Sequence, residues 1–178
     1  MKLGRPQVIS ELREKLQFDI GRHLYGVLGT YDQLGRFENE DLAQAHDHQD
    51  QPLPLPVNVN REVLRRMGDD DLRQLVDAEA RRPHAVTYRL NQEFDNLLYD
   101  LLQRKNLVIL KQLELLFAYN LELSVLRTRA SNQSHILLLM PAERRGEHLI
   151  MFHEAPPKFQ RSIPPNLIAD NHLWELTD

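Results

Sequence analysis

Histidines and acidic residues gather at two places in this sequence where they could do chemistry. The first place is His46–Asp47–His48. In extended backbone the two imidazoles would lie on one side of the chain, and with a third ligand they could bind zinc. The segment has few apolar neighbours to fix it, and it leads into three alternating prolines between residues 52 and 56. We therefore expect a polar loop here and no metal site.

The second place is near the C-terminus, where His135, His148, His153 and Glu154 flank two expected strands. If residues 134–140 and 148–155 pair across a tight turn, His135 comes close to Glu154 with His153 beside it. Such a cluster could bind a metal ion or act as acid and base. A small metal-dependent hydrolase is therefore one alternative function. In the function that we prefer, described below, we expect no catalytic residue, no metal and no cofactor.

Arginine outnumbers lysine 17 to 5, and five arginines form a candidate nucleic-acid site: Arg61, Arg65, Arg66, Arg144 and Arg145. Folding could gather them into a phosphate-binding patch. The net charge is −4, however, so the molecule as a whole is not steered to nucleic acid. Acidic residues interleave with the first three arginines, which favours local ion pairs. A nucleic-acid-binding regulator is the second alternative.

Several absences bound the function. The sequence contains no G-x-x-x-x-G-K-[ST], H-E-x-x-H or G-x-S-x-G pattern, which lowers the expectation of a standard enzyme. It contains no cysteine, which excludes disulfides and thiolate metal sites and is compatible with a reducing compartment. The N-terminus has no apolar signal region, and polar residues interrupt the most apolar stretch, 107–126. We expect a cytoplasmic protein without a membrane partner.

The hydrophobic periodicity predicts helices first and strands later, an α+β fold. We expect an amphipathic helix over 7–20, two short helices on either side of Gly68, and one long Leu/Phe-rich helix from Pro83 to about residue 116. From 113 to 125 every odd-numbered residue is apolar, which favours a strand over about 117–129. With the two strands described above, it would form a three-stranded antiparallel meander on which the helices pack.

Composition divides the chain into four parts. Residues 1–37 hold the N-terminal helix and a glycine-rich segment. Residues 38–60 form an acidic, proline-rich linker or surface loop. Residues 61–155 form the main α+β body, and residues 156–178 a proline-rich segment with a docking tail.

The preferred function is a non-enzymatic protein-interaction module: an adaptor, assembly factor or regulator that works as a homodimer. The Leu/Phe helix has more apolar surface than a three-stranded sheet can cover, and the last strand and the tail offer docking elements. The expected interaction residues are Phe94, Leu98, Leu102, Leu173 and Trp174. The partner would be another protein or a second copy of the chain.

Overall fold

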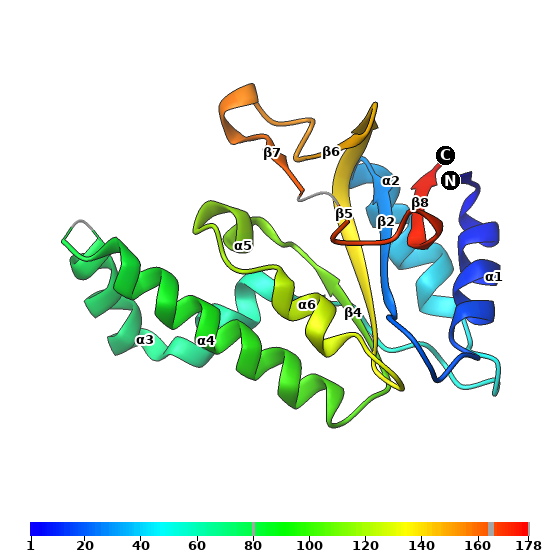
Figure 1. Cartoon of the computed structure of the whole chain (residues 1–178), viewed down its shortest axis with the longest axis horizontal. Coiled ribbons are helices and arrows are strands. Elements are labelled where there is room, and N and C mark those ends of the chain that lie inside the picture. Colours follow the sequence, from blue (N-terminus) through cyan, green and yellow to red (C-terminus); the bar gives the residue numbers. More distant parts are fainter. Residues whose placement is uncertain (80, 164–165, 178) are drawn as a thin grey trace.

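Helices cover both faces of one central sheet (Figure 1). The structure is a computed structural model that describes residues 1–79, 81–163 and 166–177. Its strands are β1 (Lys2–Leu3), β2 (Leu24–Gly29), β3 (Val57–Asn58), β4 (Leu107–Lys111), β5 (His135–Arg145), β6 (His148–Met151), β7 (Arg161–Ser162) and β8 (Leu173–Leu176).

The helices are α1 (Arg5–Lys15), α2 (Tyr31–Arg36), α3 (Val59–Glu79), α4 (Pro83–Leu102), α5 (Glu114–Ala118) and α6 (Ser124–Arg129), with short turns of helix η1 (Phe37–Asp41), η2 (Leu42–Gln44), η3 (Pro157–Phe159) and η4 (Asp170–His172). The core residues of α1, α2, η1 and η2 pack on one face of the sheet. Those of α3, α4, α5 and α6 pack on the other face. The protein is therefore a three-layer α/β fold.

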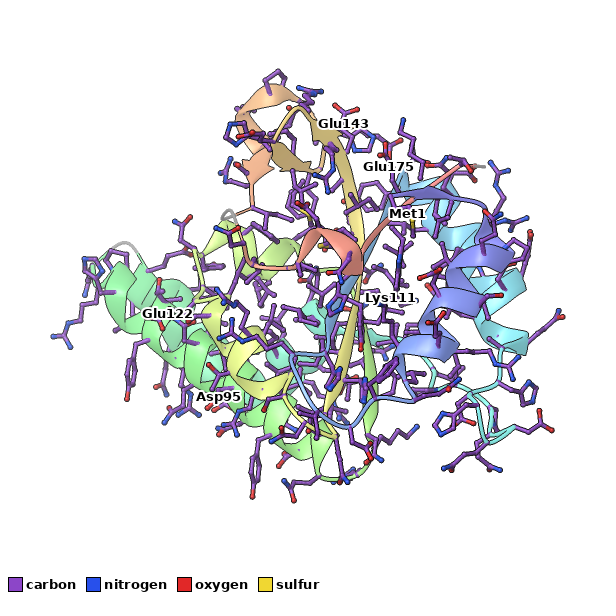
Figure 2. The ribbon with its side chains drawn as sticks, turned by 45° about the vertical axis from the view of Figure 1, so that its right-hand side comes forward. Met1, Asp95, Lys111, Glu122, Glu143 and Glu175 are labelled. Atoms are coloured by element: carbon purple, nitrogen blue, oxygen red, sulfur yellow. The ribbon has the colours of Figure 1, made fainter. Side chains whose placement is uncertain are left out.

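Parallel strands make up the main sheet, in the order β1-β8-β2-β5-β4-β3. The antiparallel strands β6 and β7 extend from the end of β5, where Arg145 pairs with His148. The two chain ends meet at the β1–β8 edge, where the main-chain N–H of Glu175 donates to the carbonyl of Met1 at 2.8 Å. Figure 2 shows these two labelled residues side by side.

The central strands are buried on both faces, which is why their sequences read as continuous apolar runs. All six residues of β2 are buried. In β5, Ile136 and Leu138 pack with the α3–α4 side, and Leu137 and Leu139 pack with the α1 side. Such runs show no alternation, so their sheet partners cannot be read from periodicity.

The expected α+β fold with a C-terminal antiparallel meander is wrong. Residues 114–118 and 124–129 form α5 and α6 and not a strand. The buried positions in this region are Leu113, Leu116, Leu121 and Leu126, so the odd-numbered pattern was a coincidence of a leucine-rich segment. Residues 135–140, expected to pair antiparallel with the next strand, lie instead between β2 and β4 in the parallel sheet. The residues that pair antiparallel with β6 are 142–145, which were expected to form the turn.

Two helix boundaries also differ from the sequence expectation. The long helix begins at Pro83 as expected but ends at Leu102, and the apolar run that follows it is strand β4. The first helix ends at Lys15 instead of residue 20. The expected break at Gly68 is present, since a non-helical backbone with a φ of 68° separates two helical parts of α3 there. Among the described residues, no helix is long and apolar enough to cross a membrane.

Candidate functional site

Two histidines and a tyrosine form a buried polar cluster at the amino ends of the central strands. His23 precedes β2, His135 begins β5, and Tyr25 lies in β2. The Tyr25 hydroxyl lies 3.0 Å from Nδ1 of His23 and 3.3 Å from Nδ1 of His135. The two imidazole rings stack with their centroids 4.2 Å apart. Because the strands are parallel, residues distant in the sequence reach the same edge of the sheet.

Burial keeps this cluster uncharged. Burial, with a smaller contribution from His23, lowers the pKa of His135 to about 4. Burial also lowers the pKa of His23, against the opposing charge of Asp19, and raises the pKa of Tyr25. A single hydroxyl proton therefore lies between two neutral imidazoles. When Tyr25 donates it to one histidine, it can accept an N–H from the other, so the two tautomers are coupled.

A cavity of about 880 Å³ borders this cluster. His135 lies on its wall, together with residues from the turn after α1, the loop after α4 and the segment that contains His48. This segment is held by Asp47, whose Oδ1 accepts the main-chain N–H groups of Gln49 and Gln51 at 2.8 and 2.9 Å. The arrangement can hydrogen-bond a polar ligand through His135. The imidazolium form of His135 is disfavoured at neutral pH, so His135 is poorly suited to donate a proton to a ligand at that pH.

The opposite, carboxyl edge of the sheet is where doubly wound folds bind ligands, and here the protein's own groups occupy it. The main-chain N–H of Tyr31, which begins α2, donates to Glu154 at 2.8 Å. The Tyr31 hydroxyl donates to Glu114 at 2.9 Å, and Asn60 donates to the other oxygen of Glu114 at 2.7 Å. Lys111 pairs with Glu38. Carboxylates that accept hydrogen bonds or ion pairs from the chain itself therefore line this edge.

The histidines expected to form a metal or acid–base cluster do not come together as predicted. His135 pairs with Leu107 at the amino edge, whereas the residues of β5 that pair with β6 are 142–145, at the far end of the strand. The predicted register that brought His135 to His153 and Glu154 is therefore wrong. His148, at the start of β6, is exposed. Within the described ranges, no group of three or more histidine, aspartate or glutamate side chains is placed to hold a metal ion.

The arginines expected to bind nucleic acid each have a carboxylate partner. Their pairs are Arg61 and Arg65 with Glu62, Arg66 with Asp100, Arg144 with Asp170, and Arg145 with Glu143. The first three come from α3 and the other two from the end of β5. They do not form one patch of unpaired charge.

Four of the five expected interaction residues are part of the chain's own core. Phe94, Leu98, Leu173 and Trp174 are all at most 3% exposed, and Leu102 is half-buried. The apolar side of α4, which was expected to meet a partner, packs instead against one face of the sheet and is part of the core. The outward side of α4 is the part of this helix that remains accessible.

The outward side of α4 carries an uncharged stripe that the sequence reasoning missed. Successive residues of an α-helix are rotated by about 100°, and on this basis the residues of the stripe fall within an arc of about 80° along about 27 Å of helix. We call this set the tyrosine stripe: Ala85, Tyr88, Gln92, Asn96, Tyr99 and Gln103, all exposed. The 11-residue spacing of the two tyrosines, on the side opposite the leucines, is a signal that the sequence already contained.

The charged residues of α4 lie beside the tyrosine stripe and are held in ion pairs. Asp95 accepts two hydrogen bonds from Arg129 of α6, at 2.9 and 3.0 Å, and Figure 2 labels Asp95 on its helix. Arg89 pairs with Glu93 at 3.2 Å, and Asp100 pairs with Arg66. The side chains of Arg89, Asp95 and Asp100 remain 43–45% exposed, but none of them belongs to the tyrosine stripe. The guanidinium of Arg129 also lies 5.3 Å from the centroid of the Tyr99 ring.

Comparison with known proteins gives no relative of this chain: no family model, no curated protein and no solved structure matches it.

Proposed function

We propose that this chain is a non-enzymatic protein-interaction module that forms a homodimer through the tyrosine stripe of α4, and that it acts in the cytoplasm as an adaptor, assembly factor or regulator. The observation that carries this proposal is the absence of charge from all six residues of the tyrosine stripe, in a sequence of which 27% of the residues are charged.

The composition of the tyrosine stripe suits an interface. Protein interfaces are enriched in tyrosine and depleted of charge at their centres, and tyrosine is among the residues that contribute most to binding. Tyr88 is 70% exposed and Tyr99 is 49% exposed. In a two-fold symmetric contact, each residue faces the same residue of the second copy or one close to it. A charged residue near the two-fold axis would therefore be repelled by its own copy, and the stripe has no such residue.

The size of the tyrosine stripe determines the affinity that we expect for the dimer. One helix surface of about 27 Å covers less than the roughly 800 Å² per partner of a standard interface. We therefore expect a reversible dimer that dissociates in the micromolar range.

Sedimentation velocity over a range of concentrations tests the proposal. The wild-type chain should shift from monomer to dimer as its concentration rises through the micromolar range. Tyr88→Arg places like charges opposite each other and should keep the chain monomeric. Ile20→Arg is the matched control, since Ile20 is 90% exposed but lies outside α4, and it should dimerise like the wild type. A wild-type chain that stays monomeric at several hundred micromolar would refute the proposal.

A further inference from the structure

Four aromatic side chains and one carboxylate surround a small cavity at the carboxyl edge of the sheet. The cavity has a volume of about 280 Å³. Its lining includes Tyr31, Phe117, Phe152, Phe159 and Glu114. These residues come from α2, α5, the turn after β6 and η3, so four separate segments of the chain converge there. We call this group the aromatic cage.

Two of the rings stand at right angles. Phe117 and Phe152 have centroids 5.4 Å apart and an interplanar angle of 84°. Phe152 holds its place with a left-handed φ of 59°, a backbone conformation that is costly for a residue with a bulky side chain. Strain of this kind persists where the surrounding structure requires it, and it is common at ligand sites.

The other two rings are exposed at the cavity. Phe159 is 54% exposed and Tyr31 is 48% exposed. The ammonium group of Lys158 already lies 4.8 Å from the centroid of the Phe159 ring. This contact shows that the Phe159 ring can be approached by a cation, within the range of about 6 Å over which a ring face attracts positive charge.

Glu114, which lines the aromatic cage, and Glu154 beside it both accept hydrogen bonds from neutral donors. Glu114 accepts hydrogen bonds from the hydroxyl of Tyr31 and the amide of Asn60, both neutral donors. Glu154 accepts from the main-chain N–H of Tyr31. Neither carboxylate has a cationic partner among the described residues. Arg161 also lines the cavity and keeps its positive charge, and its Nη1 is tied to the main-chain carbonyls of Lys158 and Gln160, at 2.8 and 2.9 Å.

We propose that the aromatic cage binds an alkylated ammonium group, with Phe117, Phe152, Phe159 and Tyr31 facing its methyl groups and Glu114 complementing its charge. Rings that present their faces to a quaternary ammonium, near a carboxylate, are the recognised way in which proteins bind this chemistry. The volume lies at the lower limit of ligand pockets, so it suits a compact head group better than a whole cofactor.

The same head group could come from a free choline-like compound or from a methylated lysine side chain. Titrations followed by NMR, with unlabelled choline added to the isotope-labelled full-length chain, test the first source. A short peptide containing trimethyl-lysine, compared with the same peptide containing lysine, tests the second. Tight binding of the modified peptide with weak binding of choline would identify a protein source, and the reverse result a small molecule.

A neutral isostere separates cation recognition from simple apolar binding. 3,3-Dimethylbutan-1-ol has the shape of choline without its charge, and it should bind at least about threefold more weakly. Equal binding of the two compounds, or no binding of either ammonium ligand at 10-millimolar concentration (roughly the weakest useful range), would overturn the proposal.

Two variants locate the site without disturbing the core. Phe159→Leu keeps an apolar side chain but removes the ring, and Glu114→Gln removes the charge. Each should weaken binding by about three- to tenfold. Phe18→Leu is the matched control, because Phe18 is 56% exposed and does not line the cage. Equal affinities for all three variants would place the ligand elsewhere and overturn the assignment.

Discussion

His23 and His135 stack with their rings 4.2 Å apart, and the hydroxyl of Tyr25 lies between their Nδ1 atoms. Both imidazoles are at most 4% exposed. Neither histidine has a carboxylate hydrogen-bonded to it among the described residues, and the charge of Asp19 offsets only part of the effect of burial on their pKa values. Protonation of either histidine therefore works against the folded state.

Stability should accordingly fall as the pH is lowered from about 6.5 to 4. The pKa of His135 is near 6.5 in the unfolded chain and about 4 in the folded one. The unfolded state therefore binds the proton first, and the contribution of His135 is complete above pH 6.5 and lost progressively toward pH 4. It amounts to on the order of 3 kcal/mol. His23 and His172, whose pKa values are also lowered, add to the slope.

Urea unfolding between pH 4 and 7.5 measures this effect. The variant His135→Gln cannot titrate and can still hydrogen-bond Tyr25, so its stability should depend less on pH than that of the wild type. A wild-type free energy of unfolding that stays constant from pH 6.5 to 4.5 would contradict the neutral cluster.

Gly26 lies where β2 is packed too closely for a side chain. A Cβ atom there would lie 2.4 Å from the terminal methyl of Met140 and 2.9 Å from a methyl of Leu173. Gly26→Val should therefore lower the free energy of unfolding by about 1–3 kcal/mol, the usual cost of overpacking. Gly35→Ala is the control, since it meets no atom within 4 Å in the helix α2 and should leave stability unchanged or raise it. Equal stability of the two variants would show that the β2 packing is looser than described.

The ion pair of Asp95 with Arg129 joins α4 to α6 beside the tyrosine stripe. Its two-pronged geometry is the kind that contributes to stability, but both side chains are partly exposed, so we expect a coupling of about 0.5–1 kcal/mol. A double-mutant cycle with Asp95→Ala and Arg129→Ala, measured by urea unfolding, gives this value directly. The coupling should shrink in high salt; a coupling of zero at low salt would show that the pair does not hold the two helices together.

Local patterns predicted some elements well. The helix from Pro83 is present, and its expected apolar residues Leu90, Phe94, Leu97 and Leu98 are buried. The reversal of the chain at Gly146 was also expected, although the residues that pair across it, 142–145 with 148–151, are not those predicted. In both cases the interacting residues lie close together in the sequence, so periodicity and turn chemistry were sufficient.

The sheet could not be predicted in the same way, because its pairings are between distant segments. Strand β2 pairs with β5 and β8, more than a hundred residues away. Its continuous burial removes the alternation that identifies a strand. Residues 117–129 gave the opposite error, because a strand was predicted where helices form. Leucines on both sides of these short, partly buried helices produce the alternation that is typical of a strand.

The candidate sites depend on these same distant pairings. His23, Tyr25 and His135 come together only because β2 and β5 are parallel neighbours. The aromatic cage requires α2, α5 and the segment after β6 to meet at the carboxyl edge. The tyrosine stripe differs from both, because it lies on one helix and was present in the sequence as a spacing.

Disulfide cross-linking tests most directly whether the tyrosine stripe meets its own copy, because the chain has no cysteine of its own. In a two-fold contact the residues near its axis face their own copies, and Gln92 and Asn96 lie at the centre of the stripe. Gln92→Cys or Asn96→Cys should form a covalent dimer rapidly under mild oxidation, whereas Gln49→Cys, exposed in the loop between η2 and β3, should not. Cross-linking at Gln92 and Asn96 that is no faster than at Gln49 would contradict the proposed dimer.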